Sequence, residues 1–175
     1  MNEIFILLGT NLGDRFAQLS LAKQYLRSQV GKIIKTSSVY ETAAWGVEDQ
    51  PAFLNQVIVL HSRLSPSECL KQTQQIEQQL GRVRIKKWGE RAIDIDLLYF
   101  NDEIIDLPDL KIPHPHIGER KFTLIPLAEV APEHLHPVYK KNSVYLLNIC
   151  KDSLPVTKIS SDEPYRHGLD QSKHV

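Results

Sequence analysis

Two aspartates, Asp94 and Asp96, alternate with apolar residues at the start of a run that ends at Phe100. Side chains alternate between faces along a strand, so the carboxylates should share one face, roughly 6–7 Å apart, with Ile93 and Ile95 on the other. Two desolvated carboxylates repel each other, and a hard divalent cation relieves that cost. Mg²⁺ takes such ligands when substrate phosphates complete its shell. The pair is therefore a candidate magnesium site, and a solvated sheet edge or pairing with nearby Arg and Lys is the alternative.

A basic segment centred on Trp88 comes just before the aspartates. Guanidinium groups fork onto phosphate oxygens, so such a segment suits a polyphosphate. A solvated basic loop is the alternative, and it is the favoured interpretation of Arg84, Lys86 and Lys87 taken singly. Trp88, in a polar loop, could stack on a planar heterocycle or pack on the protein's own surface. The chain has neither GxxxxGK[ST] nor GxGxxG, so triphosphate charge would fall to metal ions and side chains. The cations of this segment are Arg82, Arg84, Lys86, Lys87 and Arg91.

Two predicted elements carry further candidates. Phe53 and Asn55 share one face of a strand, because they are two residues apart. An aromatic ring and an amide can clamp a flat ring and hydrogen-bond its edge, although core packing alone would explain Phe53. Glu77, one residue past Ile76 on a helix, falls at the rim of the buried face. A surface charge, or a partner for Arg82, is the default interpretation of Glu77.

The segment Pro113-His114-Pro115-His116 places two imidazoles in a rigid loop. The His-x-His spacing suits zinc, but neither a Cys cluster nor an HExxH helix accompanies it. Contact of His114 with phosphate and an ordinary loop histidine are the alternatives left open. His134 and His136 repeat the spacing without better support.

The composition excludes several classes of function. The 175 residues carry 21 basic and 21 acidic side chains, so no global field favours nucleic acid or a membrane surface. No apolar stretch reaches the roughly 18 residues of a membrane helix, and the first residues lack the basic region of a signal peptide. Cys69 and Cys150 have no metal-ligand spacing. These features predict a soluble, cytoplasmic protein.

The periodicity of apolar residues predicts a strand, a helix, two strands, a helix and a final strand. The second helix has the clearest start, because Ser65-Pro66-Ser67-Glu68 can form a capping box with proline in the first turn. The order is typical of the ferredoxin-like βαββαβ fold, an α+β protein with a mostly antiparallel sheet and two helices on one face. C-terminal loops and short helices should follow. The predicted ranges are 4–8, 16–30, 33–41, 53–63, 66–80 and 94–100.

The length of the chain predicts one domain with a single core, residues 1–158. Beyond about Pro155 the apolar residues thin out, and residues 159–175 are predicted to be a polar C-terminal tail that adds nothing to the core. Two loops, 43–52 and 83–91, are long enough to take part in function.

Taken together, these stretches resemble the 6-hydroxymethyl-7,8-dihydropterin pyrophosphokinase family of folate biosynthesis. The blocks occur in order from about Ile4 to Ala131, and Trp88-Gly89-Glu90-Arg91 followed by Asp94-Ile95-Asp96 is the most specific. The other matching stretches are 9–13 (GTNLG), 37–42 (SSVYET), 49–55 (DQPAFLN), 76–77 (IE), 81–84 (GRVR), 113–115 (PHP), 120–122 (RKF), 126–127 (PL) and 131–132 (AP).

The resemblance implies a Mg²⁺-dependent transfer of pyrophosphate from ATP to the hydroxymethyl group of 6-hydroxymethyl-7,8-dihydropterin, with release of AMP. Asp94 and Asp96 would hold two Mg²⁺ ions that bridge the triphosphate, and Arg82 and Arg91 would neutralise its charge. The pterin hydroxyl would attack the β-phosphorus in line, and no dedicated base is apparent. These four side chains are the predicted catalytic residues. The protein is expected to be a monomer that binds neither nucleic acid nor membrane.

The same resemblance implies two sets of substrate contacts. Phe53 and Phe122 would sandwich the pterin ring, and Glu77 would steer Arg82. The loops 43–52 and 83–91 match the moving loops of the family. The implied pterin-binding residues are Thr42, Trp45, Gly46, Phe53, Asn55, Trp88 and Phe122. The implied ATP-binding residues are Gln74, Glu77, Arg82, Arg84, Trp88, Arg91, Lys111, His114 and Arg120.

Two positions depart from the family pattern. The loop between Arg84 and Trp88 is short, and Pro115 stands where some members have an aromatic residue after the loop histidine. Either difference would alter ATP contacts or the rate of loop closure without abolishing activity.

Two other functions fit parts of the sequence. Another Mg²⁺-dependent phosphoryl or nucleotidyl transferase on the same scaffold would release ADP or free pyrophosphate rather than AMP. A non-catalytic ferredoxin-like binding module would leave the basic loop and the paired acids without a purpose.

Overall fold

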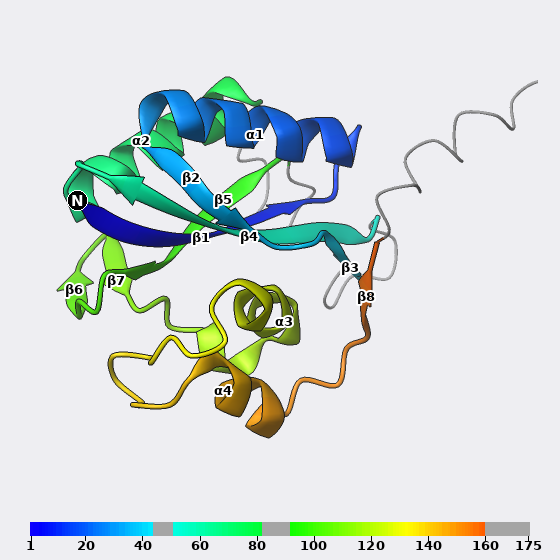
Figure 1. Ribbon diagram of the computed structural model, residues 1–175. Coiled ribbons are helices and arrows are strands. Elements are labelled where there is room, and N and C mark those ends of the chain that lie inside the picture. The colour runs from blue at the N-terminus through cyan, green and yellow to red at the C-terminus, as the bar shows by residue number, and fades with distance from the viewer. Residues whose placement is uncertain (44–50, 82–91, 160–175) are drawn as a thin grey trace, which may run out of the picture.

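The computed structural model describes residues 1–43, 51–81 and 92–159 of the chain. Within them, six strands form one sheet in the order β5-β1-β4-β3-β8, with β2 also paired to β4, and β6 and β7 form a separate hairpin (Figure 1). The elements are β1 (Asn2–Thr10), α1 (Arg15–Gln29), β2 (Lys32–Thr36), β3 (Tyr40–Thr42), β4 (Phe53–Ser62), α2 (Pro66–Gln79), β5 (Asp94–Phe100), β6 (Ile105–Leu107), β7 (Leu110–Ile112), the 3₁₀ helix η1 (Ile117–Glu119), α3 (Lys121–Val130), α4 (Ser143–Ile149) and β8 (Val156–Lys158).

Strand β1 lies inside the sheet and is antiparallel to both of its neighbours. It pairs with β4 along its whole length and with β5 from Ile4 to Gly9. Helix α1 connects β1 to β2 past β4, and α2 connects β4 to β5 past β1, so two βαβ units interlock. This arrangement is the ferredoxin-like fold, and the predicted fold class is confirmed.

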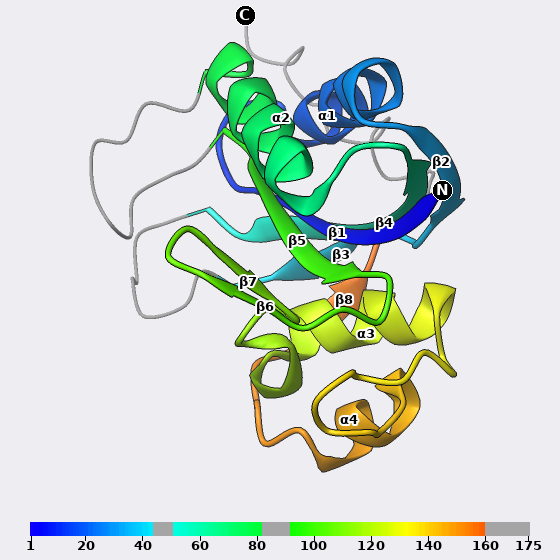
Figure 2. The same ribbon diagram turned by 90° about the vertical axis from the view of Figure 1, so that its left-hand side faces the viewer.

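Helices cover both faces of the sheet. Helices α1 and α2 lie on one face and α3 and α4 on the other, in both views (Figures 1 and 2). The core on the α1/α2 side contains Ile6 and Ile58, whereas the core on the α3/α4 side contains Leu7, Val57 and Leu124. The sequence predicted the two helices of one face and C-terminal short helices, without placing the latter on the sheet. The second layer forms because β1 and β4 carry apolar side chains on both faces.

The predicted helix starts are present. The Asp14 side chain accepts a hydrogen bond from the Ala17 N–H at 3.0 Å and caps α1. Ser65 and Glu68 form the reciprocal capping box of α2. No helix in the described ranges is long and apolar enough to cross a membrane.

The single strand predicted for residues 33–41 is divided into β2 and β3. Ser37 lies between them, and its hydroxyl accepts the Val57 N–H at 2.9 Å while its own N–H donates to the Val57 carbonyl at 2.8 Å. Because a side-chain oxygen takes the place of a backbone carbonyl, regular pairing with β4 is interrupted there.

Strand β8 is an addition to the predicted architecture. It pairs antiparallel with β3, with Lys158 opposite Tyr40 and Val156 opposite Thr42. Residues 156–158 fall within the predicted domain, but the sequence assigned no strand to them. A polar three-residue strand carries too short a pattern to be recognised, since its partner edge decides its conformation. Ile159, the first residue of the predicted tail, packs against the core on the α1/α2 side, so the predicted lack of a core contribution is wrong at this residue. Residues 160–175 of the predicted tail lie outside the described residues.

Two histidines of the predicted loops belong to the packing on the α3/α4 side. The His134 ring lies 4.5 Å, between centroids, from both Phe5 and Tyr99, and the His136 ring stacks on Tyr139 at 4.2 Å. His136 is 4% exposed, and its Nδ1 accepts the Tyr139 N–H at 3.3 Å. Burial, followed by the neighbouring His134, lowers the pKa of His136 to about 4.

The pKa of His136 makes stability depend on pH. In the unfolded chain its pKa is near 6.5, so unfolding takes up a proton below that pH, whereas the folded protein binds it only near pH 4. We expect the free energy of unfolding to fall as the pH is lowered from 6.5 towards 4, by up to about 1.4 kcal/mol per pH unit for this side chain. Thermal unfolding at several pH values in this window measures the effect.

The variant His136→Asn isolates this contribution, because its amide oxygen can replace Nδ1 as the acceptor. It should reduce the pH dependence without abolishing it, since the pKa values of His114 and His134 are lowered as well. The matched control is His116→Asn, at an exposed histidine. The same pH dependence in wild type and His136→Asn would contradict the prediction.

Candidate active site

Asp94 and Asp96 lie at the beginning of β5, which is an edge strand of the sheet. Asp94 is opposite Gly9 of β1 and is 9% exposed, while Asp96 is opposite Leu7 and is half-buried. Leu7 belongs to the core on the α3/α4 side, and Ile95, between the aspartates, belongs to the core on the α1/α2 side. The predicted shared face of the two carboxylates is confirmed, and it is the face toward α3.

Gly9 separates the acidic end of the sheet from an amide on β4. Its register partners are Asp94 on one side and Asn55 on the other. A Cβ at this position would lie 3.3 Å from the Asn55 Oδ1, closer than most Cβ contacts. Glycine therefore leaves room above β1, between a carboxylate and an amide on the same face of the sheet.

The described residues that are predicted to bind a pterin lie on the face of the sheet where Gly9 carries no side chain. The Asn55 Nδ2 donates to the Thr42 Oγ1 at 2.9 Å, and both side chains are buried. Phe53 is the register partner of Thr42 and is half-buried. Phe122, in the first turn of α3, packs against the core on the same side of the sheet. Two flat rings and a hydrogen-bonded amide–hydroxyl pair thus lie on one side of the sheet.

His114 lies in the loop after β7 and is fixed to β5. Its N–H donates to the Leu98 carbonyl at 2.9 Å, and its Nδ1 accepts the His116 N–H at 3.2 Å. Burial, followed by the charges of Arg120 and His116, lowers its pKa to about 4. The ring is therefore neutral at pH 7, and because Nδ1 is an acceptor, the ring proton is on Nε2. A neutral N–H donor of this kind suits a phosphate oxygen.

Three more predicted ATP contacts have clear positions. Arg120 precedes α3, and its guanidinium carbon lies 5.6 Å from the centre of the Phe122 ring. Lys111 is exposed on β7 and forms an ion pair with Asp106 of β6. Gln74 is exposed on α2. The roles of these three side chains in ATP binding stay predictions.

Glu77 differs from its default interpretation as a surface charge. It is 5% exposed on α2, and its Oε1 accepts the Ile95 N–H at 2.8 Å. A carboxylate that binds the backbone between Asp94 and Asp96 fixes the start of the strand that carries both. The sequence missed this contact because the helical period places Glu77 only at the rim of the buried face.

Six predicted site residues lie outside the described residues: Trp45, Gly46, Arg82, Arg84, Trp88 and Arg91. The residues next to these stretches are anchored by the last residue of β1 and the turn that follows it. The Thr10 hydroxyl donates to the Ala92 carbonyl at 2.6 Å, and the Asn11 Nδ2 donates to the Pro51 carbonyl at 3.3 Å. The sequence assigned no role to either side chain, although both belong to the Gly-Thr-Asn-Leu-Gly block.

The donor set suits a hard cation. Asp94 and Asp96 offer carboxylate oxygens, and no cluster of three or more His, Cys, Asp or Glu side chains occurs in the described ranges. Two carboxylates cannot complete an octahedral shell, so water and a phosphorylated substrate would have to supply the remaining ligands. The chemistry of the site fits Mg²⁺ bound together with a nucleotide, rather than a permanent metal centre.

The sequence of this chain is similar to those of one enzyme family. A family model described as 7,8-dihydro-6-hydroxymethylpterin-pyrophosphokinase (HPPK) matches residues 5–132. The 2-amino-4-hydroxy-6-hydroxymethyldihydropteridine pyrophosphokinase of Aquifex aeolicus is 41% identical over 141 residues, which cover 81% of this chain and 88% of the relative. The protein of the same name from Bacillus subtilis is 45% identical over 135 residues, 76% of this chain and 81% of the relative.

Solved structures show the same fold. The crystal structure of Plasmodium falciparum HPPK-DHPS wild type with pteroate matches with a TM-score of 0.69 at 20% sequence identity. The match covers 84% of this chain, which spans only 42% of that longer one. The family model, together with identities above 40% to relatives that are matched over more than four-fifths of their length, carries the assignment: the chain belongs to the 7,8-dihydro-6-hydroxymethylpterin-pyrophosphokinase family.

Proposed function

We propose that this protein transfers pyrophosphate from ATP to the hydroxymethyl group of 6-hydroxymethyl-7,8-dihydropterin and releases AMP, as a Mg²⁺-dependent step of folate biosynthesis. The observation that carries the proposal is the row Asp94–Gly9–Asn55 across three strands, in a chain whose family is defined by this activity. The row supports the proposal because the carboxylate of Asp94 and the amide of Asn55 share one face, with only a glycine between them.

The pterin ring would lie between Phe53 and Phe122 and bond to polar groups at its edge. Asn55 and Thr42 are already fixed by their mutual hydrogen bond, so little ordering entropy would be lost on binding. Trp45, Gly46 and Trp88 are proposed to complete the binding of the ring. The hydroxymethyl group would then point along the sheet towards Asp94.

The triphosphate would lie next to the aspartates. Asp94 and Asp96 are proposed to hold two Mg²⁺ ions, which when bound would neutralise phosphate charge and favour ionisation of the pterin hydroxyl. Arg120 and the Nε2–H of His114 would donate to phosphate oxygens, together with Arg82 and Arg91. Gln74, Glu77, Arg84, Trp88 and Lys111 are the remaining proposed contacts to ATP.

The reaction would proceed by in-line displacement. The hydroxymethyl oxygen forms a bond to the β-phosphorus, the bond from this phosphorus to the α–β bridging oxygen breaks, and AMP leaves. The hydroxyl proton passes to solvent, because no general base is assigned. The side chains of the site contribute positioning and charge neutralisation, which dominate phosphoryl transfer.

We further propose that residues 1–158 act as a single domain, a monomer in the cytoplasm, with residues 159–175 as a tail. Both apolar cores share one sheet, which supports a single cooperative unit. The equal numbers of basic and acidic residues give no reason to expect a nucleic-acid or membrane partner.

The proposed activity is tested by incubating the protein with ATP, Mg²⁺ and 6-hydroxymethyl-7,8-dihydropterin. We expect AMP and the pterin pyrophosphate in equal amounts, separated by liquid chromatography, and no AMP when either the pterin or Mg²⁺ is left out. Formation of ADP, or of free pyrophosphate with an AMP-linked product, would instead identify another phosphoryl or nucleotidyl transferase.

Asp94→Asn and Asp96→Asn should each abolish turnover while leaving the fold intact, because an amide neutralises the metal ligand but keeps its shape. A reduction in kcat of at least about a hundredfold is expected from the loss of metal-based charge stabilisation. Steady-state kinetics measures this, and circular dichroism checks the fold. Asp109→Asn, at an exposed position between β6 and β7, is the matched control. Wild-type rates in either site variant would rule out the metal assignment.

Glu77→Ala should destabilise the protein, because it leaves the buried Ile95 N–H without this carboxylate acceptor. We expect a loss of about 1–3 kcal/mol in the free energy of unfolding and a higher Mg²⁺ concentration for half-maximal activity. Urea denaturation and a Mg²⁺ titration of activity measure the two effects. Glu77→Gln keeps an oxygen acceptor and should lose less stability, so equal losses in the two variants would argue against the hydrogen bond as the cause.

A further inference from the structure

The chain continues past the segment that matches the family model, which ends at residue 132. Part of this continuation, residues 152–159, lies against the elements that carry the proposed pterin contacts. We refer to it as the C-terminal segment. It includes β8, which runs beside β3 (Figure 1), and it begins at Asp152, next to the start of α3.

The first attachment of the C-terminal segment is to the sheet. Val156 is the register partner of Thr42, which in turn is the partner of Phe53. The Ile159 N–H donates to the Val39 carbonyl at 2.9 Å, so in the antiparallel alternation Val156 and Thr42 form a non-hydrogen-bonded pair. Side chains of such pairs lie close together on one face. Val156 therefore lies directly beside the Thr42 side chain that accepts the Asn55 amide.

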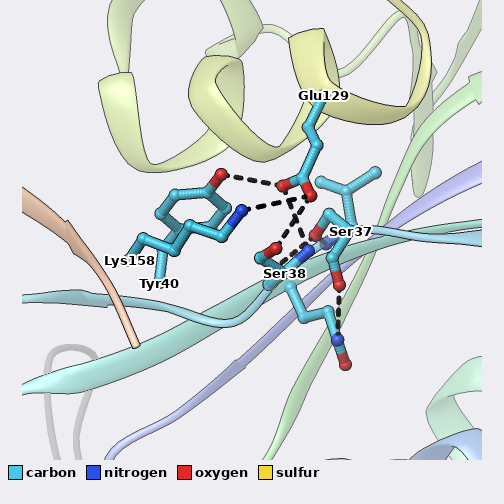
Figure 3. Close-up of polar contacts among 7 residues, drawn as sticks. Ser37, Ser38, Tyr40, Glu129 and Lys158 are labelled. Carbon is cyan, nitrogen blue, oxygen red and sulfur yellow. Dashed lines mark hydrogen bonds and ion pairs between the residues drawn. The ribbon is translucent and has the colours of Figure 1, made fainter. Parts of the chain in front are cut away.

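The second attachment is a carboxylate on α3 (Figure 3). Glu129 accepts the Ser38 hydroxyl at 2.8 Å, the Ser38 N–H at 3.0 Å and the Tyr40 hydroxyl at 2.7 Å. The Lys158 ammonium of the C-terminal segment lies 3.8 Å from the same carboxylate. Burial alone would raise the pKa of Glu129, but the hydrogen bonds from Tyr40 and Ser38 outweigh it and hold the pKa below its usual value.

The third attachment is at the other end of α3. The Asp152 Oδ2 accepts the Lys121 N–H at 2.9 Å, and its Oδ1 accepts the Leu154 N–H at 3.0 Å. Arg120, which precedes the helix, makes no side-chain capping bond. Asp152 thus supplies from a distant part of the chain the negative charge that a helix N-terminus favours. The bond is one residue away from Phe122.

We propose that the C-terminal segment is a positioning element for the pterin, because it fixes α3 and β3 relative to each other. α3 carries Phe122, and β3 carries Thr42. The attachments at Asp152 and β8 therefore act together with the direct hydrogen bond between Tyr40 and Glu129 to set the separation of the ring-stacking and edge-binding groups. Val156 adds an apolar side chain beside Thr42. This inference rests on the proposed function, and it assigns roles to Asp152 and Val156 that lie outside the family match.

Two variants of the 175-residue chain release the attachment at Asp152 and the attachment of β8 separately. Asp152→Ala removes both acceptors at the start of α3, whereas Asp152→Asn keeps one of them. Thr157→Pro removes a strand N–H that, by the same alternation, pairs with Glu41, and so disrupts β8. Lys151→Ala, at an exposed neighbouring position, is the matched control. Melting temperatures show whether each variant is folded.

Steady-state kinetics gives the KM for the pterin, the KM for ATP and kcat of each variant. The change in the KM for the pterin is compared with the changes in the other two constants. We expect Asp152→Ala and Thr157→Pro to raise the KM for the pterin about five- to tenfold, with the KM for ATP changed less than about twofold, as expected when preorganisation of one site is lost. Asp152→Asn should give a smaller rise, and Lys151→Ala none. The dissociation constant of 6-hydroxymethylpterin, measured with a non-hydrolysable ATP analogue and Mg²⁺, should rise in parallel.

The outcomes separate this inference from the proposed function. If wild type forms no AMP, the proposed function fails. If wild type is active but the Asp152 and Thr157 variants keep its KM for the pterin, the positioning role is overturned. A parallel rise of both KM values with a lower melting temperature also overturns it, since that would be general destabilisation. If Thr157→Pro does not fold, the graded pair Asp152→Asn and Asp152→Ala decides.

Discussion

Burial of the sheet on both faces is the constraint on which the rest of the structure depends. β1 and β4 carry apolar side chains towards α1 and α2 on one face and towards α3 and α4 on the other. Polar side chains in the middle of these strands would lose their hydration without a partner. Ligand-binding groups are therefore confined to one end of the strands, where Asp94 and Asn55 lie beside Gly9. Because these strands are packed on both faces, the residues at their ends are held in fixed positions.

The site itself is held by backbone contacts as much as by packing. Glu77 accepts the N–H between the two aspartates, His114 donates its N–H to the outer edge of β5, and Thr10 binds the carbonyl of Ala92. Each contact fixes main chain next to a proposed ligand group. Such anchoring lowers the entropy lost when a triphosphate and a pterin are ordered together.

Local rules were enough to predict part of this arrangement from sequence. The capping of α2, the shared face of Asp94 and Asp96, and the alternation along β4 each depend on residues close together in the chain. Contacts between residues far apart in the sequence could not be predicted. The burial of Glu77 on α2 depends on the Ile95 N–H of β5. The position of α3 depends on the second apolar face of the sheet, and β8 forms because the edge of β3 is available for pairing.

The pairing of β8 with β3 also has a kinetic consequence. Tyr40 and Lys158 come from distant parts of the chain, so their contact closes a loop that contains most of the protein, and closure costs entropy that a three-residue strand only partly offsets. Non-local pairings of this kind form late in folding and open early by local fluctuation. Amide hydrogens around Val156 should therefore exchange with solvent sooner than those of β1. The part of the site near Thr42 then has a lower local stability than the part near Asp94.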